Sequence, residues 1–124
     1  MTAALRSIHE VLAWVVIFAT GGAGAWATGA HWMPALRTRT LWLAQHVSHF
    51  LVVLQVVVGT AIVATTDVEP GQTHMFYGFL TFVGVGLIIG YRHLSAYRYL
   101  LYGLGGLFVM GLSIRALLLP GLAS

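Results

Sequence analysis

Residues 40–66, TLWLAQHVSHFLVVLQVVVGTAIVATT, contain no aspartate, glutamate, lysine or arginine. A helix needs about 20 mostly apolar residues to cross the hydrocarbon core of a bilayer, and this stretch is long enough to do so. Its polar side chains are hydroxyls, amides and imidazoles, which a membrane helix tolerates when they find partners. The stretch therefore predicts a membrane-spanning helix.

Three further stretches, 11–30, 71–91 and 99–114, are equally free of charged residues. The whole chain of 124 residues is 59% hydrophobic and only 7% charged. A soluble protein of this size can bury one such helix but not four. We therefore expect one membrane domain covering residues 1–124, with helices near 5–29, 40–66, 72–93 and 98–119.

The segments between these helices are short and contain helix breakers. Pro34 interrupts the first, Pro70 the second, and Pro120 follows the last helix, while Thr73 is a candidate cap for the third. Short connections make neighbouring helices antiparallel. The predicted fold is an all-α membrane protein, an up-down bundle of four transmembrane helices.

Arginine placement predicts the orientation of the bundle. Arg37 and Arg39 lie between the first two helices, and Arg92 and Arg98 lie between the last two. Loops rich in arginine remain in the cytoplasm, so both termini should be extracytoplasmic in a multi-pass protein of the cell (inner or plasma) membrane. The expected cytoplasmic aromatic belt contains Trp26, Trp32, Trp42, Tyr91, Tyr97 and Tyr99.

The first helix also has the features of a secretory signal peptide. Arg6 precedes an apolar stretch, and Ala25-Trp26-Ala27 has the small-residue pattern of a cleavage site. We expect the segment to be retained as a membrane helix.

Composition excludes several classes of function. The net charge is +3, but the arginines sit at helix ends and lysine is absent, so no nucleic-acid partner is expected. The lack of cysteine excludes disulfides and thiolate metal sites. The only carboxylates, Glu10, Asp67 and Glu69, fall at the predicted outer edge, which argues against an independent hydrolase, transferase or proton pump. The absence of an intramembrane charge also disfavours a small transporter.

Fifteen glycines are concentrated in the first, third and fourth helices, and Gly86 and Gly90 form a GxxxG pattern. Small residues let helices approach closely in lipid. The main interpretation is tight packing within one bundle. The alternatives are a surface for a second copy or for partner membrane subunits, and space for a flat cofactor between helices.

His9 and His74 are the strongest candidates for a cofactor site. They begin the first and third helices, which run parallel in an up-down bundle, so both lie at one depth and diagonally across the core. Two imidazoles in this arrangement are what a b-type haem with two axial histidines requires. The alternative is that both rings extend to the water interface.

Three other residues of the second and third helices are candidates for the same site. Gly78 follows His74 by four positions, and Gln55 and Gly59 share a face of the second helix. An amide within the hydrocarbon is a candidate site residue, because it is costly unless it is bonded. His9, His74, Gln55, Gly59 and Gly78 are therefore the predicted cofactor-binding residues, with the two histidines as haem-iron ligands.

The other histidines carry weaker expectations. His46 and His49 are three residues apart on one helix, a spacing that suits a metal or a quinone headgroup, but also two interfacial side chains. His31 and His93 lie at loop edges beside arginines, and we assign them no role.

Gln55-x-x-x-Gly59, Pro70, His74 and Gly78 together resemble a pattern of haem A synthases. The resemblance covers one four-helix half of a family built from two such halves, and it implies His9 and His74 as haem ligands. The second half and the cysteine pair seen in many members are missing, so it implies haem binding rather than synthase activity. The run from His74 to Phe79 also resembles short four-helix actinobacterial membrane proteins, which implies no function.

The sequence thus favours a small integral membrane subunit that binds haem b and transfers electrons in a respiratory or quinone-linked chain. Its partners would be the lipid bilayer, quinone, and either further copies of itself or neighbouring membrane subunits. The alternative is a non-catalytic accessory or scaffold subunit of a larger membrane complex, which the glycine-rich helices and short loops also suit.

Overall fold

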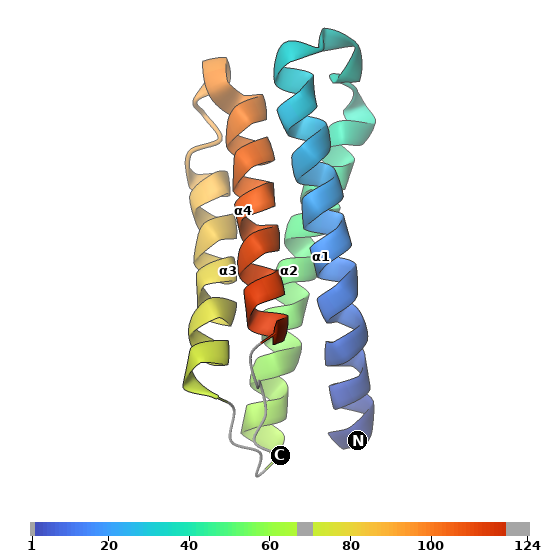
Figure 1. The fold of residues 1–124 in the computed structure, drawn as a ribbon, viewed down its shortest axis with the longest axis vertical. Helices are drawn as coiled ribbons and strands as arrows, with labels where there is room; N and C mark the ends of the chain where they lie inside the picture. The colour runs from blue at the N-terminus through green and yellow to red at the C-terminus, as the bar shows by residue number, and fades with distance from the viewer. Residues whose placement is uncertain (1, 67–70, 119–124) are drawn as a thin grey trace.

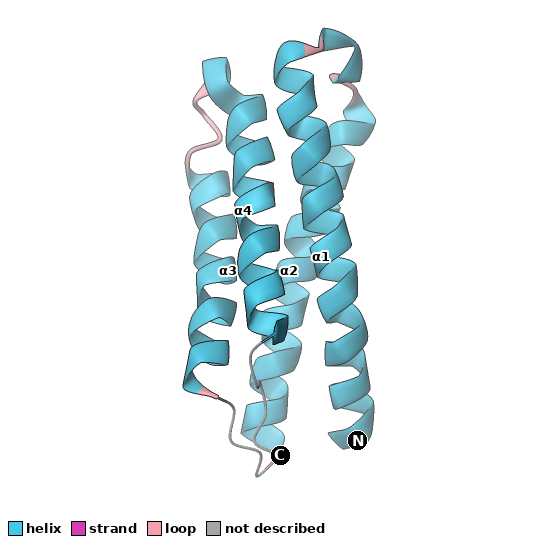
Figure 2. Ribbon diagram, viewed as in Figure 1, coloured by secondary structure: helices cyan, strands magenta, loops and turns pink. Residues whose placement is uncertain are grey.

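The computed structural model describes residues 2–66 and 71–118, which are helical almost throughout (Figures 1 and 2). Each of the four long helices has the length and composition to cross a membrane, which confirms the predicted all-helical class and its four candidate spans. The helices are α1 (Thr2–Trp32), α2 (Arg39–Thr65), α3 (Gln72–Gly90) and α4 (Arg98–Leu118), with short 3-10 turns η1 (Pro34–Leu36) and η2 (Ser95–Tyr97).

The helices run alternately up and down and form a four-sided bundle (Figure 1). α1 packs against α2 and α4, and α3 packs against the same two helices, so α1 and α3 lie across the bundle from each other. The α1–α4 contact is the most extensive, and α2–α3 is the sparsest of the four sides. The bundle is therefore packed most tightly between α1 and α4 and most loosely between α2 and α3.

Two helix limits differ from the sequence prediction. α1 extends beyond 5–29 in both directions, because no breaker occurs before Pro34. α3 ends at Gly90 rather than at 93; the next residues form a turn, and the Arg92 side chain donates to the Ile89 carbonyl at 2.6 Å, replacing a helical hydrogen bond. Several predicted loop residues lie outside the described part of the chain: Asp67, Glu69, Pro70 and Pro120.

The start of α3 also corrects a prediction. Its N-cap is Gly71, with extended backbone and no side-chain cap, so the expectation that Thr73 caps this helix is wrong. α2, by contrast, has a side-chain cap, because the Thr38 hydroxyl accepts from the Leu41 amide at 3.3 Å. A hydroxyl in this position satisfies one of the free amides at a helix start.

Glycines bring α1 and α4 into backbone contact. A methyl group added at Gly24 would lie 2.7 Å from the Leu107 nitrogen and 2.9 Å from the Gly103 oxygen. Tight packing within the bundle therefore explains this part of the glycine pattern. Gly86 and Gly90 differ, because an added methyl group at either position meets no atom within 4 Å. The predicted GxxxG pattern thus contributes no close helix contact within the bundle.

The interior between the two ends combines apolar packing with hydrogen bonds. Gln45 is 1% exposed, and its Nε2 donates to the Ala23 carbonyl of α1 at 2.8 Å. This bond ties the first half of α2 to α1. The apolar cluster beside it consists of Val16, Ala27, Val52, Val85, Ile88, Tyr102 and Val109.

Candidate functional site

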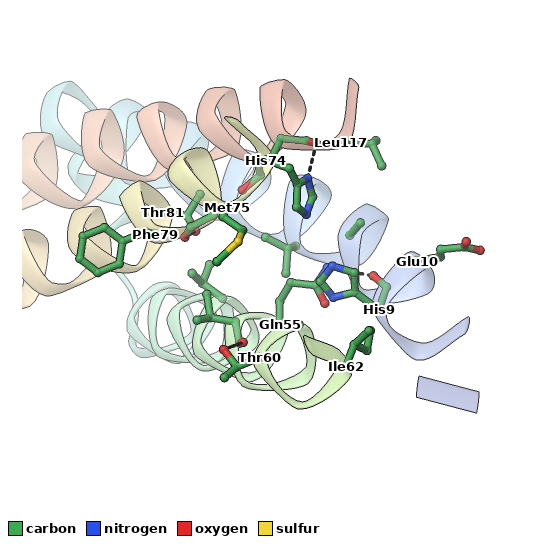
Figure 3. A pocket seen from close by; sticks show the side chains of 18 of the residues that line it. His9, Glu10, Gln55, Thr60, Ile62, His74, Met75, Phe79, Thr81 and Leu117 are labelled. Carbon is green, nitrogen blue, oxygen red and sulfur yellow. Dashed lines mark hydrogen bonds between the residues drawn. The ribbon is translucent and has the colours of Figure 1, made fainter. Parts of the chain in front are cut away.

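A cavity of about 560 Å³ lies where the starts of α1 and α3 meet the ends of α2 and α4 (Figure 3). Residues of all four helices line it. On the α2–α3 side its walls include Thr60, Met75 and Phe79, which are exposed on the outer surface of the bundle. The cavity is therefore accessible from the side. All five residues predicted to bind a cofactor line it: His9, Gln55, Gly59, His74 and Gly78.

The structure brings the rings of His9 and His74 together inside this cavity. Their centroids are 6.2 Å apart, and their planes meet at 71°. The His74 ring reaches from α3 toward His9 on α1, as Figure 3 shows. Two helices on opposite corners of the bundle thus bring two imidazoles together edge-on, with both rings lining one cavity.

The orientation of His74 is set by a hydrogen bond to α4. Its Nδ1 lies 2.8 Å from the backbone oxygen of Ala116. A carbonyl can only accept, so we assign the ring hydrogen to Nδ1, which leaves a lone pair on Nε2. Ala116 lies in the last turn of α4, where carbonyls lack helical partners. The helix end therefore supplies an acceptor that selects this tautomer.

His9 is held from α2. The Gln55 amide lies beside the His9 imidazole (Figure 3), and its Nε2 donates to the His9 backbone oxygen at 2.8 Å. A methyl group added at Gly59 would lie 3.1 Å from Cε1 of His9, tighter than an ordinary contact. Gly59 thus leaves the space that the ring needs against α2.

Two polar atoms of this site lack partners. His9 Nδ1 and Gln55 Oε1 are buried and make no hydrogen bond. Burying such groups unpaired costs about 1–3 kcal/mol each, so an unpaired donor or acceptor in a cavity indicates a missing interaction. Gly78 borders open space, since an added methyl group there would meet nothing within 4 Å.

Sequence reasoning missed the contribution of α4 to the site. Ser113, Ala116 and Leu117 line the cavity, and the Ala116 carbonyl fixes His74. A backbone carbonyl leaves no trace in the residue type, so no pattern could have revealed this contact. Arg6 and Glu10 also line the cavity, which places one charge of each sign there.

His46 and His49 lie in different environments despite their helical spacing. His46 is exposed, whereas His49 is 5% exposed and stacks on Tyr102 with centroids 5.6 Å apart. Both ring nitrogens of His49 are buried without a hydrogen-bond partner. The two rings therefore lie in different surroundings, and only His46 has the exposure expected of an interfacial side chain.

At the opposite end, arginines stack on the aromatic residues. The Arg98 guanidinium lies 4.5 Å from the Trp42 ring centre, and Arg37 lies 4.7 Å from that of Tyr99. Trp26 donates to the Leu36 carbonyl at 3.0 Å, joining α1 to η1. This end combines cations and amphipathic rings, the composition of a membrane interface.

Comparisons with models of protein families, with curated proteins and with solved structures find no match to this chain. The resemblance to haem A synthases therefore remains a prediction.

Proposed function

We propose that this chain is a small membrane subunit that binds a b-type haem between His9 and His74 and serves in electron transfer. The observation that supports the proposal most directly is the separation of the two rings. An imidazole nitrogen binds a metal at about 2.0–2.1 Å and lies ~1.2 Å from its ring centre, so rings on opposite sides of one ion are about 6.4 Å apart. The ring centres of His9 and His74 are 6.2 Å apart, with the ring planes at 71°, so the match lies in the spacing of the ring centres.

The donor set favours a macrocycle over a bare ion. Metals bound by protein side chains alone, such as structural zinc, take about four ligands. Within residues 2–66 and 71–118, no group of three or more His, Cys, Asp or Glu side chains is positioned to hold a metal ion. A porphyrin supplies four nitrogens itself and needs only the two axial histidines.

The surrounding residues suit the remainder of such a group. Cofactor pockets usually enclose about 300–1,000 Å³, and this cavity of about 560 Å³ falls within that range. Gly59 and Gly78 limit side-chain bulk on the α2 and α3 walls, and Arg6 supplies a cation for a propionate. The bound haem would exchange single electrons between its ferric and ferrous states.

The opening between α2 and α3 supports quinone as the redox partner. Met75 and Phe79 line the cavity and are also exposed on the outer surface, so lipid would reach the cavity edge. A lipid-soluble quinone can approach by that route without crossing the bundle. The arginine placement supports an orientation in which this site lies in the outer half of a cell membrane and both termini are extracytoplasmic.

Absorption spectra of the purified protein, oxidised and then reduced with dithionite, test the proposal. We expect a Soret band that shifts on reduction, and its loss in both His9→Ala and His74→Ala. His46→Ala and His93→Ala are matched controls, since both side chains are exposed away from the cavity. Two results would refute haem binding at this site. One is a folded protein that stays colourless after incubation with haem, and the other is a Soret band that survives both His9→Ala and His74→Ala.

A second candidate is a non-catalytic subunit of a larger membrane complex. It is favoured by Gly86 and Gly90, both exposed and both free of atoms within 4 Å of an added methyl group, because outward-facing small residues suit a docking helix. Purification in mild detergent, followed by mass measurement of wild type and Gly86→Leu, tests it. A stoichiometric membrane partner lost in the variant would support this role, and a monomer in both would refute it.

A further inference from the structure

The Gln55 side chain makes a hydrogen bond to the backbone of His9. The amide Nε2 donates to the His9 carbonyl, which as a helical residue also accepts from its own helix. The other end of the amide, Oε1, is buried and makes no hydrogen bond. The amide nitrogen of Gln55 is therefore hydrogen-bonded, and its amide oxygen is not.

The unpaired atom on the His9 ring is its chemical complement. His9 Nδ1 is buried and also makes no hydrogen bond. A neutral imidazole carries its hydrogen on one of its two nitrogens, and an amide oxygen accepts. Gln55 lies beside the ring (Figure 3), so its amide oxygen and this ring nitrogen are neighbouring atoms with complementary hydrogen-bonding needs.

We infer that Gln55 is a positioning residue that accepts a hydrogen bond from His9 Nδ1 and thereby presents Nε2 to the haem iron. The inference rests on the proposed haem site. It gives the two ligands equivalent support: His74 Nδ1 donates to the Ala116 carbonyl, and His9 Nδ1 donates to the Gln55 amide. Such partners fix the ring tautomer and orientation and raise the basicity of the ligand.

The two supports differ in one respect that makes the inference testable. The acceptor for His74 is backbone and survives any side-chain substitution, whereas the acceptor for His9 can be changed. Both substitutions remove the Nε2 bond to the His9 carbonyl. Gln55→Leu also removes the acceptor, whereas Gln55→Glu retains an acceptor and adds negative charge at a pH at which the new carboxyl is ionised. Negative charge near Nδ1 makes the imidazole a stronger electron donor to the iron, and this stabilises the ferric over the ferrous state.

The test uses the full chain in detergent micelles, titrated with haem b. For Gln55→Leu we expect haem affinity to fall by about 10–100-fold, with altered EPR g-values in the ferric protein. For Gln55→Glu we expect haem to be retained and the midpoint potential to fall. In the protein without haem, ¹⁵N NMR should show the His9 hydrogen on Nδ1 in wild type and a shift toward Nε2 in Gln55→Leu.

Gln45→Leu is the matched control for a merely structural role. Gln45 is another amide on α2 that donates to an α1 carbonyl at 2.8 Å, but it does not line the cavity. Its loss should weaken the helix contact without changing the g-values, the potential or the His9 tautomer.

The outcomes separate this inference from the proposed function. If haem binds and requires both histidines, but Gln55→Leu keeps wild-type affinity, g-values and tautomer, then Gln55 does not position His9. A potential in Gln55→Glu that stays at the wild-type value across a pH titration that ionises the new carboxyl would overturn the inference in the same way, even where Gln55→Leu fails to fold. If wild type binds no haem, the proposed function fails and this inference fails with it.

Discussion

Replacing Gly24 by alanine should destabilise the bundle because it separates α1 from α4. The added carbon would lie 2.7 Å from the Leu107 nitrogen and 2.9 Å from the Gly103 oxygen, where ordinary contact begins at 3.4 Å. Both obstacles are backbone atoms, so no side-chain rotation can relieve the overlap, and the two helices must move apart by about 0.5–1 Å. A gap of that size loses roughly a quarter to a half of the dispersion energy of each contact along the interface.

We expect Gly24→Ala to lower the free energy of unfolding by about 1–3 kcal/mol, the usual cost of overpacking a close interface. Gly86→Ala is the matched control, since nothing lies within 4 Å of its added carbon. It should be neutral or gain about 0.5–1 kcal/mol from the better helix propensity of alanine.

Reversible unfolding in mixed micelles with increasing dodecyl sulfate, followed by circular dichroism and tryptophan fluorescence, measures both variants. The two midpoints should move in opposite directions, or Gly24→Ala alone should move. If Gly24→Ala is as stable as Gly86→Ala, then the backbones of α1 and α4 do not approach as closely as described, and the glycine-mediated interface is not what holds the bundle together.

Three further changes test other parts of the structure. Gly59→Ala should weaken haem binding, because its methyl group would lie 3.1 Å from His9 Cε1; haem titration measures this, and affinity equal to wild type would contradict the described position of His9. His49→Leu should leave unfolding stability unchanged or higher, since it removes two buried nitrogens without hydrogen-bond partners. A marked loss in the micelle assay would mean that stacking on Tyr102 outweighs the cost of burying those nitrogens. Thr38→Ala removes the cap of α2 and should cost about 0.5–2 kcal/mol in that assay, whereas Thr38→Ser should retain most of the stability.

Much of the architecture could be predicted from the order of charged and uncharged residues. Four uncharged stretches separated by short segments require four antiparallel helices, because each stretch can cross a bilayer and no connection is long enough to do otherwise. The same order places His9 and His74 near the same end of parallel helices. Their common depth therefore follows from chain topology alone, before any side-chain contact is known.

Which face of each helix points inward was decided by the tertiary structure alone. In water, an amphipathic pattern separates buried from exposed positions, but lipid is as apolar as a leucine side chain, and the pattern largely disappears. Gly24 and Gly86 are the same residue in similar helices, yet an added carbon would meet the backbone of α4 at Gly24 and nothing within 4 Å at Gly86. His46 and His49 likewise differ in burial despite their spacing.

The details of the candidate site depend on the same packing. The 6.2 Å separation of the histidine rings, the Gln55 contact with His9 and the Ala116 carbonyl that orients His74 all arise between residues far apart in the chain. Charge distribution determined how many helices there are and which ends meet. Helix rotation and the sparse contact between α2 and α3 determined which side chains share the cavity, because in an apolar solvent only direct packing distinguishes one face of a helix from another.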